Sequence, residues 1–224
     1  MKGFPIITKA DIKKEYNCND DYAYTKLNRL YKQNKIKKIV KGKYTQIDNI
    51  YVISSNLYTP SYISFWTASS LKGYTEQIVN TIHVVTTKNH NEIIFENYKI
   101  CFHKFSKSTF FGYQKERVGN FFQFIVDDEK LIIDCLLFQR FIGNFDELIK
   151  ILKKSILSKN KIITYLKKIN NISLNKRVGF LFEKFKGIDL SNELNINDKN
   201  YIDLSFFKKG VKIDSKWRLK HDFN

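Results

Sequence analysis

The sequence has few cysteines, and they lie far apart. There are three, Cys18, Cys101 and Cys135, and none belongs to a CxxC pair or to a Cys/His ligand spacing. This pattern speaks against a disulfide framework and against a zinc site, and it is typical of a reducing compartment. No secretory signal is readable after Met1, so we expect a cytoplasmic protein.

Long apolar runs are missing as well. The longest, over residues 131–138, is interrupted by Asp134. It is far too short to cross a bilayer, which takes about 20 apolar residues. We therefore predict no membrane partner. Asp134 itself is expected to pair with a lysine or a backbone amide rather than to act in catalysis.

The sequence also lacks the motifs of common catalytic sites. It contains no HExxH, GxGxxG or P-loop pattern. Its four histidines, which have no serine or cysteine partner at a usable spacing, are His83, His90, His103 and His221. We expect them to be surface or strand residues. The sequence thus predicts a protein that is not an enzyme, with no catalytic residue, no metal and no cofactor.

Positive charge is abundant and unevenly distributed. The net charge is +17 and lysine outnumbers arginine 34 to 5, a bias that AT-rich codons favour. Residues 1–50 hold 12 basic against 5 acidic residues, and residues 148–188 hold 11 against 1. A polyanionic partner is expected for a chain with such basic regions.

The N-terminal stretch predicts a winged helix-turn-helix. Thr8 is a candidate N-cap for a helix over residues 9–16, which a turn over residues 17–20 ends. A second helix, capped by Asp20 or Asp21, is expected to run to about residue 34. The β-prone runs 36–40 and 43–47 around Lys41-Gly42 then predict a basic hairpin.

The second helix has two faces. Its apolar stripe consists of Ala23, Leu27, Leu30, Tyr31 and Asn34. The opposite face carries groups of the kinds that read base edges, and the hairpin carries lysines placed for phosphates. The predicted DNA-binding residues are Tyr22, Thr25, Asn28, Arg29, Lys32, Lys41 and Lys43. The alternative is a helical hairpin with a β-ribbon used for protein contacts.

The remaining chain predicts a mixed domain of helices and strands. Residues 48–59 are expected to connect the two domains, and Ser61 to cap a helix over residues 61–72. Strands are predicted over 81–87, 93–95, 98–105 and 121–126, helices over 129–140, 144–154, 159–169 and 173–185, and two tail strands around Lys209-Gly210. The fold class is therefore α+β, with a winged-helix domain over residues 1–50 and an α/β domain with a small antiparallel or mixed sheet over residues 51–224.

Several downstream segments, in order, resemble the AbiEi family of antitoxins and transcriptional regulators. They are YISFWTASSLKG within residues 61–73, IVNTIHVVTT over 78–87, FFGY over 110–113, DEKLIID over 128–134, KRVGFLFE over 176–183 and SKWRL over 215–219. The resemblance implies a winged helix that binds inverted repeats in double-stranded operator DNA and represses its own operon. It also implies a C-terminal domain that counteracts a nucleotidyltransferase toxin in a type IV system, without a stable complex.

Two alternatives to a sequence-specific repressor stay open. The spacing of Asp203, Asp214 and Lys216 resembles the core of a metal-dependent nuclease, in which carboxylates bind Mg²⁺. A basic interaction module that does not read sequence is the other alternative.

The second basic region, residues 148–188, has three possible explanations. It could reflect codon bias, contact bent flanking DNA, or form the surface that neutralises the toxin. The residues predicted for that antitoxin surface are Lys153, Lys154, Lys167 and Lys168.

Overall fold

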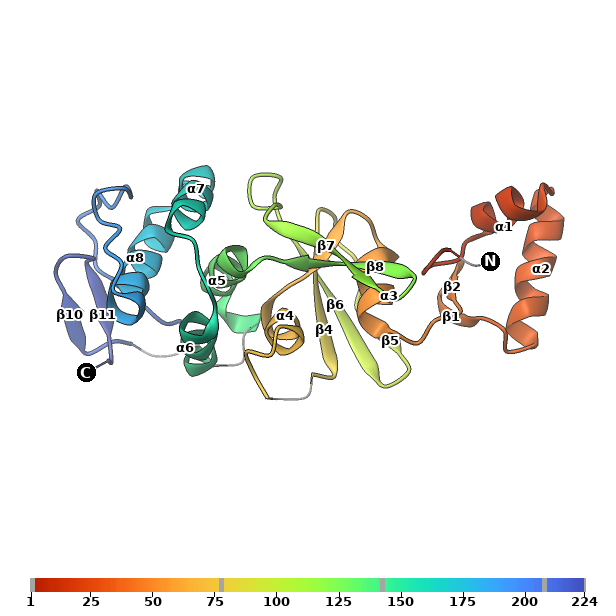
Figure 1. Ribbon diagram of the computed structural model, residues 1–224, viewed down its shortest axis with the longest axis horizontal. Coiled ribbons are helices and arrows are strands. Elements are labelled where there is room, and N and C mark those ends of the chain that lie inside the picture. Colours follow the sequence, from red (N-terminus) through yellow and green to blue (C-terminus); the bar gives the residue numbers. More distant parts are fainter. Residues whose placement is uncertain (1–2, 77–78, 142–143, 207–208, 224) are drawn as a thin grey trace. The chain divides into compact units, whose positions relative to one another are not determined.

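The computed structural model describes residues 3–76, 79–141, 144–206 and 209–223 (Figure 1). It combines helices and sheets, as the α+β prediction requires. The chain forms two compact units. The first comprises Met1–Ile63, Asn80–Phe105 and Gln114–Ile125, and the second Ser64–Val79, Ser106–Tyr113 and Val126–Asn224. The first unit thus contains the N-terminal 50 residues together with a sheet, and a domain boundary at residue 50 stays a prediction.

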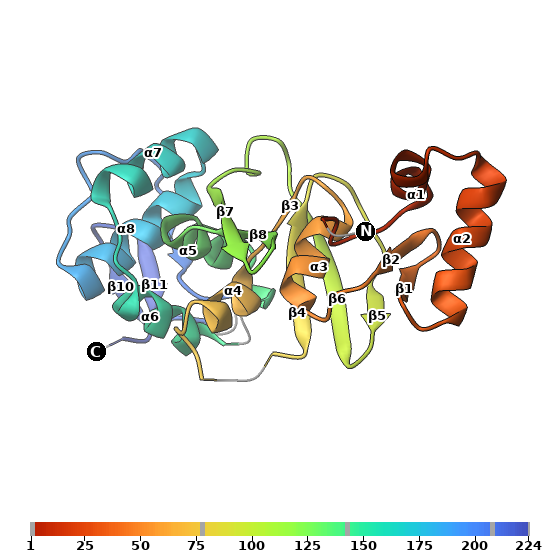
Figure 2. The ribbon, with the colours of Figure 1, turned by 45° about the vertical axis from the view of Figure 1, so that its right-hand side comes forward.

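The N-terminal segment has the predicted order of two helices and a hairpin (Figures 1 and 2). The elements are α1 (Lys9–Tyr16), α2 (Asp20–Lys32), β1 (Lys37–Val40) and β2 (Lys43–Thr45). Thr8 caps α1 as predicted, in a capping box with Asp11. The N-cap of α2 is Asn19, whose side chain accepts the Tyr22 N–H, so the prediction of Asp20 or Asp21 was wrong.

This segment has a small apolar core of its own. The core residues are Ile7, Ile12, Ala23, Leu27, Leu30, Ile36 and Tyr44. Ile7 forms an isolated β-bridge with Tyr44, which ties the residues before α1 to the hairpin. The two helices and the hairpin are therefore held together by apolar burial and by backbone pairing.

A mixed six-stranded sheet forms the rest of the first unit. Its order is β5-β6-β4-β3-β8-β7. The strands are β3 (Ser61–Ile63), β4 (Thr81–Thr86), β5 (Ile93–Phe95), β6 (Tyr98–Lys104), β7 (Tyr113–Val118) and β8 (Phe121–Val126). One face is covered by α3 (Ile50–Leu57), whose Ile53 and Leu57 are fully buried against Ile82 and Val84 (Figure 1).

Two segments around α3 differ from the prediction. Residues 48–59 were expected to be a connection, but Asn49 caps α3 by accepting the N–H groups of Tyr51 and Val52. The predicted helix over residues 61–72 was wrong in its first turn. Residues 61–63 pair with β4 and β8 instead, because buried strand pairing outweighs local helix propensity.

The second unit is mostly helical. Its helices are α4 (Phe65–Leu71), α5 (Asp128–Leu137), the 3₁₀ turn η1 (Gln139–Phe141), α6 (Phe145–Lys154), α7 (Lys159–Ile169) and α8 (Ile172–Lys186). A small sheet in the order β10-β11-β9 follows, made of β9 (Ile202–Asp203), β10 (Lys212–Asp214) and β11 (Leu219–His221). The tail hairpin turns over residues 215–218 rather than at the predicted Lys209-Gly210, since β10 pairs with β11.

Buried polar groups fix the start of this unit. Lys130 and Asp134 of α5 are fully buried and form an ion pair, and the Ser64 hydroxyl donates to Asp134 at 2.8 Å. Asp134 is thus paired with a lysine, as expected, and both side chains are fully buried. Within the described residues, no helix is long and apolar enough to cross a membrane.

Candidate nucleic-acid interface

The face of α2 opposite its buried stripe is open to solvent. Ala23, Leu27 and Leu30 are buried on one side of the helix. On the other side Tyr22, Thr25, Arg29 and Lys32 are exposed and Asn28 is half-buried. The helical period therefore places the predicted base-reading residues together on one surface. In the described part of the chain, no side chain or backbone group pairs with the Arg29 guanidinium.

An acidic residue at the start of α2 fixes the two helices. The Asp20 carboxylate accepts hydrogen bonds from Lys13 and from Lys9, with both N–O distances at 2.5 Å. These bonds lower the pKa of Asp20 to about 2, with the Lys13 bond as the largest cause. The pairing also neutralises part of the positive charge on α1. The cationic surface of the segment is consequently smaller than its lysine count suggests.

The lysines of the hairpin divide into two classes. Lys38 and Lys41 are exposed, and Lys41 lies at the turn, where Gly42 has a φ of 79°. Lys37 instead pairs with Asp48 at 2.6 Å and with Glu96 at 2.5 Å, which raises its pKa to about 12. Of these three lysines, Lys38 and Lys41 are therefore available to phosphates.

Lys43 has a different environment from the one predicted. Its ammonium donates to the Leu57 carbonyl and lies 4.0 Å from the centre of the Tyr58 ring. Partial burial lowers the pKa of Lys43. Its side chain is thus directed to the end of α3, whereas Lys41 is exposed at the turn.

The four lysines of the predicted antitoxin surface are exposed at the ends of two helices. Lys153 and Lys154 end α6, and Lys167 and Lys168 end α7. Positive charge is favourable at this end of a helix because it opposes the helix dipole. Lys186 of α8 even donates to the carbonyls of Lys153 and Ser155 at the C-terminus of α6.

Other charges of the second basic region are paired with acids. The pairs are Lys150–Glu147, Lys159–Glu193, Lys161–Asp127, Lys161–Glu129 and Lys176–Asp198. Helix ends and ion pairs thus give much of this region a structural explanation.

The three residues of the nuclease alternative do not form a common site. In the β9-β11-β10 sheet, Asp203 lies level with Lys220 and Asp214 level with Leu219. Adjacent register rows point to opposite faces, so the two carboxylates diverge. Lys216 pairs with Glu183 and Asp189 at 2.7 and 2.8 Å. Nowhere in the described residues do three His, Cys, Asp or Glu side chains form a group that could hold a metal ion.

His83, His103 and Cys101 are part of the six-stranded sheet. His83 and His103 lie on neighbouring strands, with 2.8 Å between Nδ1 and Nε2. All three cysteines are free thiols. Burial, with a bond to Glu92, raises the pKa of Cys101 to about 11, so this thiol is not an activated nucleophile.

Two of the segments that carry the family resemblance pack on one another. Gly179 of α8 lies directly under the Trp217 ring, and Glu183 Oε2 accepts the Trp217 indole N–H at 2.5 Å. The preceding Arg177 donates to the Asp203 carbonyl through two nitrogens, at 3.1 and 3.0 Å. These residues therefore dock the C-terminal tail onto α8.

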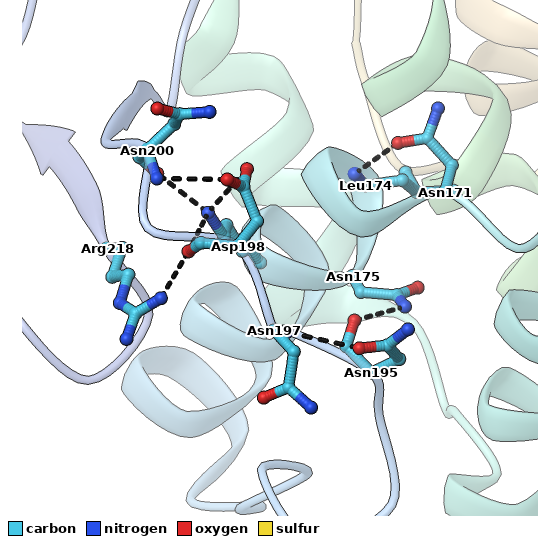
Figure 3. Close-up of polar contacts among 9 residues, drawn as sticks. Asn171, Leu174, Asn175, Asn195, Asn197, Asp198, Asn200 and Arg218 are labelled. Carbon is cyan, nitrogen blue, oxygen red and sulfur yellow. Dashed lines mark hydrogen bonds and ion pairs between the residues drawn. The ribbon is translucent and has the colours of Figure 1, made fainter.

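An asparagine-rich segment completes this docking (Figure 3). The Asn175 amide donates to the Asn195 carbonyl at 2.9 Å, and the Arg218 guanidinium donates to the Asp198 carbonyl. Lys176, which is fully buried, donates to the Asn200 carbonyl at 2.7 Å. Bonds to backbone carbonyls stabilise a chain segment that has no regular structure of its own.

The segments of the resemblance near α5 also meet. Gly112 has a φ of 71° and lies against the Lys130 side chain, which a Cβ at this position would overlap. The segment over residues 78–87 includes β4, but Ile78 lies outside the described residues. No family model matches the chain, and no curated protein is significantly similar to it.

Proposed function

We propose that this chain is a DNA-binding transcriptional repressor whose α1, α2 and β1-β2 hairpin act as a winged helix-turn-helix. The observation that carries the proposal is the open face of α2, which groups Thr25, Asn28 and Arg29. A recognition helix needs such a row of hydrogen-bonding side chains to read base edges in the major groove.

The charges around this face support the same function. Lys32 extends the face along the helix, and Lys38 and Lys41 are exposed on the neighbouring hairpin. Lysines at the border of a reading helix contact phosphates and fix its register on the duplex. The proposal thus divides the surface into a base-reading centre on α2 and a phosphate-binding hairpin.

The antitoxin role is the more specific part of the proposal. It rests on the resemblance to the AbiEi family, in which such a repressor binds operator inverted repeats and counteracts a nucleotidyltransferase toxin without a stable complex. The close packing of Gly179 on Trp217 supports the resemblance, because it brings the motifs over residues 176–183 and 215–219 into contact.

Arg29→Ala tests the DNA-binding proposal. The variant should weaken binding to the chain's own promoter DNA by about 1–3 kcal/mol, since a bidentate arginine–guanine contact is worth this much. Binding to a scrambled duplex should change much less. Affinities would be measured by fluorescence anisotropy at one fixed salt concentration.

The matched control is Arg117→Ala. Arg117 is exposed on β7, where it donates to the Gly119 carbonyl. Arg117→Ala removes one positive charge, as Arg29→Ala does, but leaves α2 unaltered. Its effect on promoter binding should therefore be small. Equal losses on promoter and scrambled DNA for Arg29→Ala would make Arg29 a phosphate contact. No preference for promoter DNA in the parent protein would overturn the repressor proposal.

A further inference from the structure

A polar pocket of about 400 Å³ opens in the first unit beside Lys43. Its walls come from the stretches 6–8, 56–60 and 86–90 and from Lys43 of β2. The pocket therefore collects residues from before α1, from the hairpin, from the end of α3 and from the end of β4. Four separated segments form it, so no local sequence pattern could reveal it.

The charge of the pocket has one sign. Lys43, Lys88 and His90 line it, and none of the described residues that form its wall is acidic. The Lys43 ammonium has three N–H donors. It donates to the Leu57 carbonyl and lies over the Tyr58 ring, and both of these partners are neutral. A partly buried cation with only neutral partners is incompletely compensated, so this site favours an anion.

His90 forms one side of the pocket. Its ring stacks on Tyr58 at 3.8 Å between centroids and 6° between planes. Burial and the positive charges of Lys43 and Lys88 lower the pKa of His90, so the imidazole is neutral at neutral pH. A neutral imidazole can donate one hydrogen bond to an anionic oxygen, and a nearby dianion would favour its protonation.

The rest of the lining suits an organic group attached to the anion. Ile6, Leu57 and Pro60 provide apolar surface, and the hydroxyls of Thr59 and Thr87 provide further hydrogen-bonding groups. The volume falls in the range of about 300–1,000 Å³ that is usual for small-molecule sites. A bare inorganic anion would leave most of this space unfilled.

We propose that this pocket binds a small organic phosphate, with the phosphate at Lys43, Lys88 and His90 and the organic part on the apolar wall. Two ammonium groups match the double negative charge of a phosphate monoester, and lysine binds phosphate as a point charge. The same chemistry could come from a backbone phosphate of DNA, and the experiment separates these two sources.

The test uses the full-length protein and phenyl phosphate as the probe, and a separate titration replaces the probe with a scrambled duplex. Isothermal titration should show saturable binding at one site, with Kd of about 1 mM or tighter, and NMR titration should show the pKa of His90 rising in the bound state. Lys43→Met and Lys88→Gln should each weaken binding about tenfold or more. The matched control is Lys115→Met, because Lys115 is exposed on β7 and does not line the pocket.

Each other outcome overturns the proposal. Absence of saturation by phenyl phosphate at about 10 mM, a concentration well above that Kd, would do so. An equal loss in Lys115→Met would show attraction by net charge alone. A response of His90 to a scrambled duplex but not to phenyl phosphate would assign the pocket to DNA phosphates. If Lys43→Met fails to fold, Lys88→Gln decides alone, since the Lys88 side chain is exposed. Because no operator is present, the result does not depend on the repressor proposal.

Discussion

Gly179 has no space for a side chain. A Cβ at this position would overlap the Cζ3 and Cη2 atoms of Trp217, whose ring is fully buried. The close approach of α8 to the Trp217 ring is thus possible only with glycine. The residue lies in the interior of a helix, where glycine costs about 1 kcal/mol relative to alanine, so packing outweighs helix propensity here.

Gly179→Ala should destabilise the protein by about 1–3 kcal/mol, the usual cost of overpacking a filled core. Urea unfolding followed by far-UV circular dichroism would measure the change. The same substitution in a Trp217→Phe background should cost less, because the smaller ring leaves space for a methyl group. An equal cost in both backgrounds would contradict the packing explanation.

His83 makes stability depend on pH. Burial is the largest cause that lowers its folded-state pKa to about 4, against an ordinary value of 6.5. Between these two values the unfolded chain binds more protons than the folded chain. The stability that His83 contributes is therefore full above pH 6.5 and is lost as the pH falls toward 4.

As the pH falls from 6.5 to about 4, the parent protein should lose up to about 3 kcal/mol of stability through His83. This figure follows from 1.36 kcal/mol per pKa unit. His83→Gln should remove this part of the pH dependence. Thermal unfolding of both proteins between pH 7.5 and 4.5 would show it, and parallel curves of melting temperature against pH would contradict it.

At the scale of elements, the hairpin combines two unlike lysines around one glycine turn. Lys41 is exposed, whereas Lys43 is bonded to the end of α3. The sequence alone made them equivalent candidates for phosphate contact. The end of α3 makes the difference, because it offers the Lys43 ammonium a carbonyl and a ring face, whereas Lys41 lies at the turn.

Lys41→Ala should reduce the slope of log K against log salt by about 0.9, the value for one lost phosphate contact on duplex DNA. Lys43→Ala should leave this slope unchanged, since its ammonium lies over Tyr58. Affinity for promoter DNA at four or more salt concentrations gives both slopes. An unchanged slope for Lys41→Ala would exclude a phosphate contact at the turn.

At the scale of the whole molecule, the net charge of +17 overstates the free positive surface. Many lysines oppose a carboxylate within their own unit. Exposed pairs of this kind contribute little to stability, about 0–1 kcal/mol each. The lysines left on α2, the hairpin and the ends of α6 and α7 are thus the candidates for anionic partners.

Replacing Lys153, Lys154, Lys167 and Lys168 with glutamine tests the antitoxin surface. Glutamine removes the charges without placing acids at helix C-termini, where glutamate would destabilise the helices. We expect normal operator binding and loss of toxin neutralisation, measured as survival of cells that express the cognate toxin.

The matched control for this experiment replaces four other exposed lysines with glutamine. They are Lys104, Lys107, Lys199 and Lys209. This variant should still neutralise the toxin. It lowers the net charge as much as the first variant does, but it leaves the lysines of α6 and α7 in place. Survival with the first variant would contradict the antitoxin surface, and weaker operator binding would favour a contact with flanking DNA.

The sequence by itself determined the elements whose signals are local. The cap Thr8, the turn before α2 and the 3.6-residue period of α2 are set by neighbouring residues, so the helix and its open face could be predicted. The same holds for the acidic start of α5 and for the lysines that end α6 and α7. Each signal acts over at most two turns of helix.

Only the tertiary structure decided the features that depend on distant partners. Residues 61–63 became a strand because β4, about 20 residues further along the chain, buries them. Lys43 left the predicted phosphate-binding surface because the end of α3 supplies a carbonyl and a ring. Local propensity is a weak preference, and burial and hydrogen bonding between segments far apart in the sequence override it.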